Sequence, residues 1–471
     1  MSKVTHHPPG PNLNPLQLAL AFKRDAIGLI TGIFHTHGDL AYLKMPGRHV
    51  YLVNDAEIVK DVLVTNNHKF IKGRALQLFK RLLGNGLLAS EGDFHRRQQK
   101  LMMPSFRKQQ VEQYADVMLT LATRMDDSWH DGATVDMHHE MMKLTLQVAV
   151  KSLFNSDIDD DVREIGAALT VGMEMFERTA MPFAEKMEHW PLPSNRRFAK
   201  AKATIHAIIQ RIIDEHRHRG EDTGDLLSAL LKAQDEDGSH MTDAQLKDEV
   251  TTLFVAGHET TAVALFHTWY MLTQHPAVER KLHDELDAVL GGRPPTLADY
   301  ERLPYTRMVF QEVLRLYPSV WALSREAIAD YQIGPYFVPK GSSIAFFPYM
   351  LHRNPRYFDQ PEKFDPDRWR PEAGEGRPRY AYIPFGGGAR SCIGESFAWL
   401  EGVLTLAMLS QRWWVRLAPG QKLDTVSLLT LRPRRDLRMV LHARPQLAAA
   451  EAPAQPVAIA PAKAAGCPMH P

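Results

Sequence analysis

The chain has very little cysteine and almost no net charge. Only two of its 471 residues are cysteines, Cys392 and Cys467, which excludes the disulfide framework of small secreted domains. Its 56 lysine and arginine residues nearly balance 55 aspartate and glutamate residues, giving a net charge of +1. This balance argues against a global affinity for nucleic acid. We therefore expect a cytoplasmic protein that binds no nucleic acid.

Long uninterrupted apolar runs are also missing. The most apolar N-terminal stretch, residues 16–34, contains Lys23-Arg24-Asp25 and so falls short of the roughly 20 apolar residues that a transmembrane helix needs. No basic segment is followed by a short apolar core and a cleavage site, which disfavours a signal peptide. We expect no membrane anchor.

The chain lacks internal repeats and an interior linker, so we expect one large domain between two irregular ends. Residues 1–15 are rich in proline and histidine and are predicted to run extended. Residues 16–445 form the predicted domain. The Ala/Pro-rich residues 446–471, which include Cys467, are predicted to be a disordered tail.

Helical periodicity dominates the interior, and strand patterns are few. Residues 39–44 and 48–53 alternate around Met45-Pro46-Gly47 and predict a hairpin, and short strands are expected within 325–350. A mostly irregular stretch is expected over 353–384. The predicted fold class is mostly α with a small β-rich lobe. The predicted helices cover residues 55–66, 109–128, 138–154, 160–178, 196–219, 243–275, 277–290 and 304–316.

The most informative segment surrounds Cys392, the one cysteine of the predicted domain. Three glycines, Gly386 to Gly388, precede it, and a helix is predicted from Cys392 to about Gln411. Glycines let backbone amides approach the sulfur, and a helix N-terminus favours a thiolate over a thiol. A metal-ligating thiolate is one interpretation, and an inert buried thiol is another. Zinc is disfavoured because no second cysteine lies nearby.

A second segment, Ala256-Gly257-His258-Glu259-Thr260-Thr261, interrupts an apolar helix. A glycine in a helix interior costs about 1 kcal/mol relative to alanine. A carboxylate in apolar surroundings costs desolvation unless it has a partner or a task. Ala256 and Thr260 share a helix face, so the small alanine leaves room for a flat group near the threonine hydroxyl. The alternative is a surface helix with a polar stripe.

These two motifs resemble those of the cytochrome P450 superfamily. The segment from Phe385 to Gly394 matches the haem-binding pattern Phe-x-x-Gly-x-Arg-x-Cys-x-Gly at every fixed position. The resemblance extends from Pro8 to about Arg444. It implies a cytochrome P450 fold with haem b between the helix that carries Thr260 and the helix after Cys392. It also implies a monooxygenase that inserts one oxygen atom of O₂ into its substrate, using electrons from NAD(P)H.

The resemblance also implies roles for single residues. Cys392 would be the metal ligand, through its thiolate, and Thr260 with Glu259 would relay protons during oxygen activation. Arg390 and Arg325 would bind the haem propionates, because the arginine fork suits a carboxylate. Further implied cofactor contacts come from Phe385, Gly386, Ala256 and Gly257.

One part of the early basic helix departs from the family pattern Trp/His-x-x-x-Arg. His95 fits the first position and is expected to contact the haem, but Gln99 stands where arginine is common. We expect Arg96 or Lys100 to replace the missing arginine.

A weaker motif is Glu312-Val313-Leu314-Arg315. Residues three apart on a helix can form an ion pair, and an exposed pair contributes only a few tenths of a kcal/mol. The resemblance implies instead a buried network of Glu312, Arg315 and Arg368. Such a network would brace the wall behind the cysteine loop without doing chemistry.

The electron donor is expected to be a separate protein. No flavin or iron–sulfur domain is evident, and 26 residues follow the predicted domain. We expect a ferredoxin or flavodoxin-type donor with its reductase, and a monomeric enzyme. A positive cluster could steer an acidic donor, although a merely solvated basic helix explains it equally well. The cluster comprises Arg96, Arg97, Lys100, Arg107 and Lys108.

The segments expected to line the substrate pocket are apolar and rich in methionine, which adapts to irregular guests. They predict a small apolar substrate that is fatty-acid-like, terpenoid or steroid. Two alternatives on the same fold are a peroxide-driven peroxygenase and a non-catalytic haem sensor, and the intact Glu259-Thr260 pair argues against both. The expected lining residues are Leu76, Leu78, Phe79, Leu82, Leu83, Leu87, Leu88, Met173, Met175, Phe176, Met181, Phe183, Trp190 and 320–323.

Overall fold

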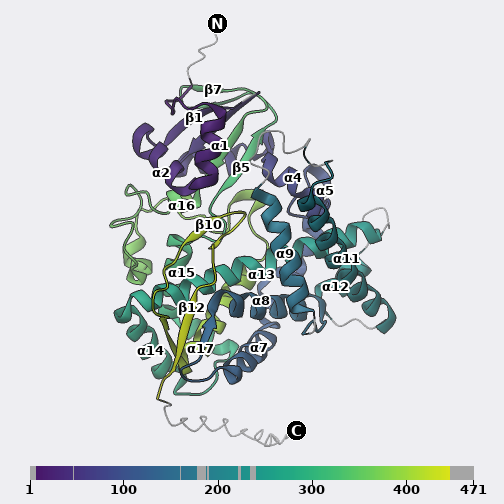
Figure 1. The fold of residues 1–471 in the computed structure, drawn as a ribbon, viewed down its shortest axis with the longest axis vertical. Coiled ribbons are helices and arrows are strands. Elements are labelled where there is room, and N and C mark those ends of the chain that lie inside the picture. Colours follow the sequence, from purple (N-terminus) through teal and green to yellow (C-terminus); the bar gives the residue numbers. More distant parts are fainter. Residues whose placement is uncertain are drawn as a thin grey trace, which may run out of the picture.

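The computed structural model describes residues 7–45, 47–159, 161–177, 187, 190–220, 224–233 and 240–445. These residues are mostly helical, and a small β-rich lobe lies at one end of the long axis (Figure 1). This confirms the predicted fold class.

The lobe is built on a five-stranded sheet with the order β1-β2-β8-β5-β3. The predicted hairpin is present, because β1 and β2 pair antiparallel, whereas β2 and β8 pair parallel. Strand β3 pairs with β5 so that Lys72 lies opposite Arg325. The strands are β1 (Leu40–Met45), β2 (Arg48–Val53), β3 (Phe70–Lys72), β5 (Leu323–Ala327) and β8 (Ser343–Phe346).

Two helices that periodicity did not predict, α1 (Pro15–Arg24) and α2 (Ala26–His37), complete this lobe. They have clear start signals, since Asn14 and Gln17 form a capping box on α1 and the Asp25 side chain caps α2. Their apolar side chains share a cluster with strand residues of the sheet, and Phe34 packs edge-on against Phe347 at 5.9 Å. Residues 7–14 form no helix, and the carbonyl of Pro9 accepts a hydrogen bond from the amide of Tyr42.

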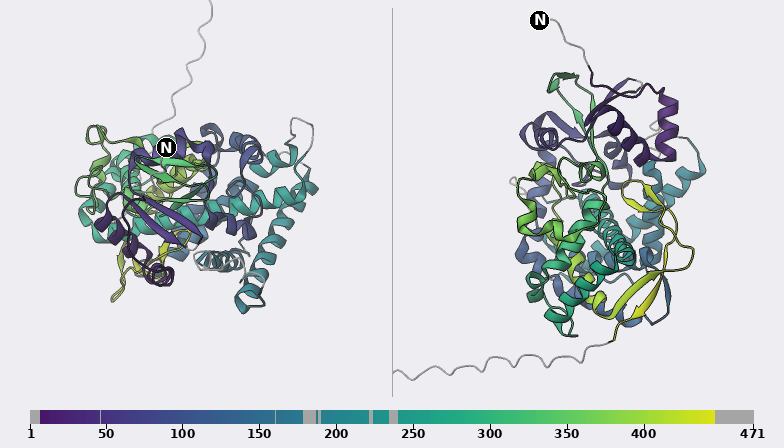
Figure 2. Two further views of the ribbon diagram at one scale, coloured as in Figure 1. Left: turned by 90° about the horizontal axis from the view of Figure 1, so that it is seen from above. Right: turned by 90° about the vertical axis from the view of Figure 1, so that its left-hand side faces the viewer.

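The helical part is arranged around one long helix, α13, and two views at right angles show it running through the interior (Figure 2). Most predicted helices are present, but the one expected over 109–128 is divided at Gln113 and Tyr114. The main helices are α3 (Ala56–Lys60), α4 (Arg74–Leu83), α5 (Gly92–Met102), α6 (Lys108–Glu112), α7 (Ala115–Ser128), α8 (Met137–Phe154), α9 (Val162–Glu177), α11 (Pro193–Arg219), α12 (Leu226–Lys232), α13 (Asp243–Gln274), α14 (Pro276–Leu290), α15 (Pro304–Leu316), α16 (Pro348–Leu351) and α17 (Glu395–Arg412).

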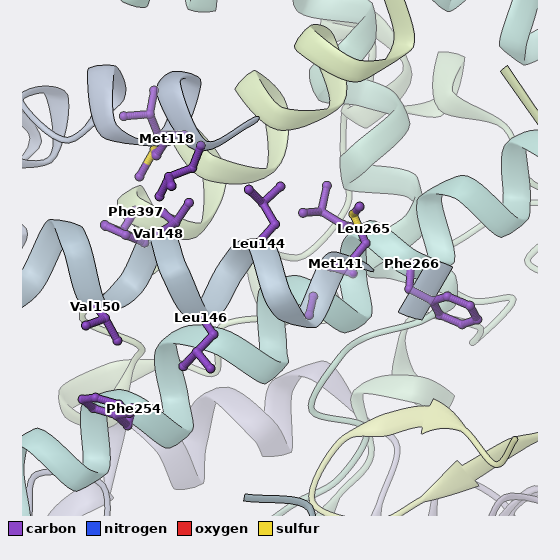
Figure 3. Packing of buried hydrophobic residues seen from close by; sticks show 14 of the residues in the cluster. Met118, Met141, Leu144, Leu146, Val148, Val150, Phe254, Leu265, Phe266 and Phe397 are labelled. Carbon is purple, nitrogen blue, oxygen red and sulfur yellow. The ribbon is translucent and has the colours of Figure 1, made fainter. Parts of the chain in front are cut away.

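The largest apolar cluster joins α7, α8, α13 and α17. Met118, Leu144, Phe254 and Phe397 from these four helices belong to it (Figure 3). The interface of α8 with α13 includes stacked rings of Phe154 and Phe254, 5.4 Å apart. Burying apolar area contributes about 25 cal/mol per Å². This packing therefore fixes α13 and α17, the two helices that carry or follow the predicted motifs.

Smaller strands occur in both parts of the molecule, since residues of β6 and β7 share an apolar cluster with the five-stranded sheet. One sheet has the order β4-β12-β9, and two hairpins, β6–β7 and β10–β11, complete the β structure of the described residues. None of the described helices is long and apolar enough to cross a membrane. The predicted tail, residues 446–471, lies outside the described residues. These strands are β4 (Thr134–Asp136), β6 (Tyr331–Ile333), β7 (Tyr336–Val338), β9 (Trp413–Leu417), β10 (Thr425–Ser427), β11 (Leu431–Pro433) and β12 (Arg438–Ala443).

Candidate functional site

The cysteine loop is a tight turn that only glycine permits. Gly386 and Gly388 have φ of +74° and +68°, the left-handed region that favours glycine. A Cβ on Gly388 would lie 2.0 Å from the carbonyl oxygen of Leu63, so the loop is pressed against the backbone of residues 61–65. The amide of Cys392 donates to the carbonyl of Phe385 at 2.9 Å and closes the loop.

The surroundings of Cys392 do not by themselves favour a thiolate. The protein atoms around the sulfur raise the pKa of the Cys392 thiol to about 11 and outweigh the hydrogen bond from the Gly394 amide, although the side chain keeps accessible surface. The helix N-terminus contributes little here, since α17 begins three residues later, at Glu395, whose negative charge also raises the thiol pKa. The thiolate ligand stays a prediction. A bound metal ion would reverse this balance and deprotonate the sulfur.

Two residues within otherwise buried surroundings keep accessible surface. Ala256 is exposed although Val255 and His258 on the same helix are buried, and Cys392 is exposed in the loop before α17. Helix α13 packs against α17. The accessible alanine thus lies on a helix that packs against α17, and α17 begins three residues after the accessible thiol.

Glu259 is buried, so the alternative of a polar surface stripe is wrong. Its side chain is 2% exposed, and Oε1 accepts a hydrogen bond from the Thr430 hydroxyl at 2.5 Å. Burial raises the pKa of Glu259, while Arg432 and the Thr430 hydrogen bond oppose that rise. Thr260 is partly accessible, and its hydroxyl donates to the carbonyl of Ala256 at 2.9 Å.

A cluster of buried cations lies beside the cysteine loop. Lys72 and Arg325 are buried, and Arg390 is 14% exposed at its side chain. Glu91 is the one carboxylate that the described residues place among them, and it forms an ion pair with Arg390. Its Oε1 also accepts the backbone amide of Lys72 at 2.6 Å. Three cations therefore share one anion.

The pKa values of this cluster show that burying its positive charges close together is unfavourable. Burial, reinforced by Arg325 and Arg390, lowers the pKa of the Lys72 ammonium to about 7. Burial lowers the pKa of Arg325 to about 10, again with Arg390 contributing. His95 is buried on α5 with a pKa lowered to about 4, chiefly by burial. Its Nδ1 lies 3.1 Å from the Leu87 carbonyl, and its Nε2 has no partner in the described part of the chain.

Sequence patterns missed Lys72, which belongs to a three-residue strand at the edge of the sheet. A lysine in the run Phe-Ile-Lys belongs to no sequence pattern that would mark it as a site residue. Its position becomes visible only through the strand pairing that sets it opposite Arg325. The two expected substitutes for an arginine at position 99 are both exposed on α5, and Arg96 pairs with Asp93.

The motif on α15 forms a buried network with the 3-10 turn Pro366–Trp369. Arg315 and Glu312 are both 0% exposed and are joined by two hydrogen bonds of 2.8 Å. Arg368 Nε donates to Glu312 Oε1 at 3.3 Å, and Trp369 Nε1 donates to Oε2 at 2.9 Å. Three backbone carbonyls, of His352, Pro361 and Lys363, accept from the Arg315 guanidinium. The alternative of an exposed ion pair is wrong.

The residues expected to line a substrate pocket divide into three groups. Phe79, Leu82, Leu83, Leu87 and Met173 are buried in the main cluster, and Leu88 and Met175 pack against it. Trp321 instead packs in the β-rich lobe, where its Nε1 donates to the carbonyl of Leu428, and Trp190 is 54% exposed. Met181 and Phe183 lie outside the described residues, as does the side chain of Phe176.

A loop after α4 connects the cation cluster with α13. At its beginning, Asp248 accepts the amide of Asn85 at 2.7 Å and Glu249 accepts the amide of Leu87 at 2.8 Å. At its end, Glu91 pairs with Arg390. Glu249 is 1% exposed, and burial raises its pKa to about 8.

The basic cluster is exposed for the most part. Arg96, Lys100, Arg107 and Lys108 are exposed. Phe106, immediately before Arg107, lies 3.9 Å from the position that a Cβ on Gly394 would occupy. Arg107 and Lys108 thus directly follow a residue that reaches the segment that carries Cys392.

Comparison with known proteins gives a consistent result. The family model described as Cytochrome P450 matches residues 8–437. A protein of Streptomyces melanosporofaciens named cyclooctatin synthase is 40% identical over 390 residues, covering 82% of this chain and 85% of the relative. From the same organism, cyclooctat-9-en-7-ol 5-monooxygenase is 38% identical over 392 residues, covering 82% and 84%. Pentalenene oxygenase of Streptomyces avermitilis is 34% identical over 411 residues, covering 87% and 91%.

The matched residues cover nearly the whole described chain. They include the glycine-rich turn before Cys392, the buried Glu259 beside Thr260 and the Glu312 network. The chain therefore belongs to the cytochrome P450 family and is a haem-thiolate monooxygenase by membership.

Proposed function

We propose that this enzyme hydroxylates a cyclic terpenoid, with Cys392 as the thiolate ligand of haem b. The observation that carries the cofactor assignment is the cluster of buried cations beside the cysteine. Lys72, Arg325 and Arg390 face a single carboxylate, Glu91. The two propionates of haem would supply the missing negative charge, because buried charges are costly unless they are paired.

The residues of the site fit haem in other respects. Arg390 Nη1 and His95 Nε2 are buried and have no partner among the described residues, so both are available to a propionate. A carboxylate next to His95 would favour its protonated form, which donates from Nε2. Lys72 would take the place of the arginine that Gln99 replaces. The faces of Ala256 and Gly257 would leave room for the flat ring on α13.

Bound haem would supply the activation and transfer of oxygen, chemistry that amino-acid side chains do not provide. The protein would supply position and protons. Thr260 presents a hydroxyl on the Ala256 face of α13, and Glu259, the next residue, would accept and release a proton inside the protein. Phe385 and Gly386 would shape the loop around the sulfur. The Glu312–Arg315–Arg368 network would hold the wall behind it.

The substrate class rests on the relatives and on the apolar surroundings of the site. Three relatives are named as a cyclooctatin synthase, an oxygenase of cyclooctat-9-en-7-ol and an oxygenase of pentalenene. These names describe cyclic terpenoids rather than fatty acids. The buried leucines of α4 and its following loop, with Met173 of α9, offer apolar contacts suited to such a guest.

Electrons would come from NAD(P)H through a separate iron–sulfur or flavin protein. The exposed basic cluster, part of which follows a residue that reaches the cysteine loop, supports docking of an acidic donor there. Raising the ionic strength is expected to slow electron transfer, because salt screens exposed charges.

The assignment of Cys392 is tested by spectroscopy. The reduced, CO-bound enzyme is expected to show the red-shifted Soret band of thiolate-ligated haem, and Cys392→Ala is expected to abolish that band. Cys392→Ser is the matched variant, since it keeps size and polarity but not the soft ligand. An unchanged band in Cys392→Ala would disprove the ligand assignment.

The substrate class is tested by a spectral titration of the oxidised enzyme with pentalenene, lauric acid and progesterone. We expect the terpenoid to displace the water on the iron, seen as a shift of the Soret band, at lower concentration than the other two. Tighter binding of the fatty acid or the steroid would contradict the proposed class.

A further inference from the structure

The carboxylate of Glu259 is held by a hairpin that is remote in sequence. The β10–β11 hairpin contributes Thr430, whose hydroxyl donates to Glu259 Oε1 at 2.5 Å, and Arg432, whose Nη1 lies 3.9 Å from the same oxygen. Thr430 is 1% exposed and the Arg432 side chain 13%. The contact is therefore a desolvated one, in which both hydrogen bonding and charge are strong.

The hairpin is fixed relative to α13 on a second side. The amide of Leu431 donates to the carbonyl of Ser319 at 2.9 Å, and the Ser319 hydroxyl donates to the carbonyl of Thr260 at 2.7 Å. Trp321 Nε1 donates to the carbonyl of Leu428 at 2.7 Å. The turn that carries Thr430 is thus tied, through Ser319, to the helix residue next to Glu259.

Glu259 and Thr260 are successive residues, so their side chains leave the helix about 100° apart and do not face each other. In the structure the carboxylate is turned to the hairpin, whereas the Thr260 hydroxyl lies against its own helix at Ala256. The contacts of the carboxylate with the hairpin therefore determine its distance from the face of α13 that carries the Thr260 hydroxyl.

We propose that Arg432 and Thr430 are positioning residues that hold the carboxyl of Glu259 turned away from Thr260, and so control when it delivers a proton. This inference rests on the proposed proton relay. A protonated Glu259 loses its attraction to Arg432 and is free to turn. Arg432 is the one charged group that the described residues place at ion-pair distance from Glu259.

The titratable neighbours on the other elements are consistent with this role. His138, at the start of α8, packs edge-on against Phe266 at 5.6 Å. Its pKa is lowered to about 3, mainly by burial and then by Arg432, which keeps its ring neutral beside the arginine. His258, on α13 itself, also has a pKa lowered by burial, to about 4. Neither histidine supplies a second positive charge near neutral pH.

The direct test measures the protonation of Glu259 itself. Infrared difference spectra against pH, with the carboxyl band assigned by its loss in Glu259→Gln, follow this one group without turnover. Arg432→Met is expected to raise the apparent pKa of Glu259 by at least one unit, and Arg432→Lys is expected to restore most of the wild-type value. Thr430→Val is expected to raise it less, and Thr430→Ser to restore it. An identical titration in Arg432→Met and wild type would overturn the proposal.

The functional consequence is read with NADPH, spinach ferredoxin and its reductase as the electron supply. Arg432→Met is expected to change the solvent deuterium isotope effect on NADPH consumption, and Arg432→Lys to return it towards wild type. The control is Arg434→Met, two residues further along, whose guanidinium pairs with Asp424 at 3.0 Å and is 45% exposed. It is expected to behave as wild type.

Haem content and the CO spectrum are recorded for every variant. A variant of Arg432 that lowers both in proportion to NADPH consumption, with an unchanged isotope effect, would show a merely structural role and overturn the proposal. Failure of the proposed function has a different signature, because wild-type protein would then lack the Cys392-dependent CO band while the Glu259 titration could still be measured.

Discussion

Glu249 is a buried carboxyl for which the described residues provide no neighbour of opposite charge at ion-pair distance. Its carboxyl receives one backbone hydrogen bond, from Leu87, and burial raises its pKa to about 8. The folded state therefore favours the protonated form. Since the unfolded pKa is near 4.5, the free energy of unfolding falls as the pH rises from about 4.5 to about 8.

Glu249→Gln is expected to remove this pH dependence, because the glutamine carbonyl still accepts from Leu87 and carries no charge. At pH 8.5 the variant should be about 1–3 kcal/mol more stable than wild type, with a smaller gain at pH 6. Urea unfolding at both pH values measures this. Asp248→Asn, which alters the neighbouring and more accessible carboxylate, is the control. Equal slopes of stability against pH in wild type and Glu249→Gln would contradict the argument.

At the residue scale, the sequence predicted those features that a local pattern of residue types indicates. Glycines before Cys392 and an acid in an apolar helix are local signals, and the structure shows the tight glycine turn and the buried acid. Lys72 carries no such signal, because a lysine at the end of a short strand is ordinary. Its importance comes from a strand pairing over more than 250 residues of sequence, with β5. The sequence also could not show that the surroundings of Cys392 raise its thiol pKa, because Glu395 and the packing around the loop become visible only in the fold.

At the scale of elements, the link between α15 and the turn Pro366–Trp369 depends on one carboxylate. Glu312 accepts hydrogen bonds from Arg315, Arg368 and Trp369 within a region closed to solvent. Removing one partner of a buried ion pair leaves the other charge uncompensated, at a cost of about 3–5 kcal/mol. The arrangement stabilises the fold only while it is complete.

Glu312→Gln is therefore expected to destabilise the protein by about 3–5 kcal/mol, measured as a lower midpoint in urea unfolding. The matched control is Glu362→Gln. Glu362 is 74% exposed and pairs with Arg353 at 3.1 Å, so its loss should change stability by about 0.5 kcal/mol or less. Similar effects of the two substitutions would show that burial does not govern this network.

Helices with a long, regularly repeating apolar face were predicted accurately. Helices whose main sequence signal is a capping residue were missed. Helices α8, α13, α14 and α15 begin and end within about two residues of the predicted bounds. Helices α1 and α2 were missed, although Asn14, Gln17 and Asp25 provide capping signals. The break between α6 and α7 contains no glycine or proline, so no local residue type indicated that the helix would be interrupted there.

At the scale of the whole molecule, the cation cluster predicts opposite effects of one substitution in two states. Without haem, Lys72 is a buried ammonium with too little negative charge around it, so Lys72→Met should raise the melting temperature of haem-depleted protein. With haem, the same variant loses a propionate partner, and its affinity for hemin should fall about tenfold or more. Calorimetry of the depleted protein and hemin titration measure the two effects.

Lys69→Met is the control, because the Lys69 ammonium lies over the Tyr331 ring at 5.3 Å and away from the cluster. It should leave hemin affinity unchanged. If Lys72→Met lowered stability and left hemin affinity intact, Lys72 would not bind a propionate. Since haem binds the folded state, hemin should also raise the melting temperature of wild type in a concentration-dependent way.

The position of β3 has a consequence for the life of the protein in the cell. Like charges directly opposite each other on paired strands are unfavourable, and Lys72 and Arg325 are such a pair on the outermost strand of the sheet. In cells short of haem, the newly made chain would retain that repulsion, and β3 would separate most readily from β5. The uncovered strand edge would invite pairing between chains, so cofactor supply during synthesis should decide between soluble enzyme and aggregate.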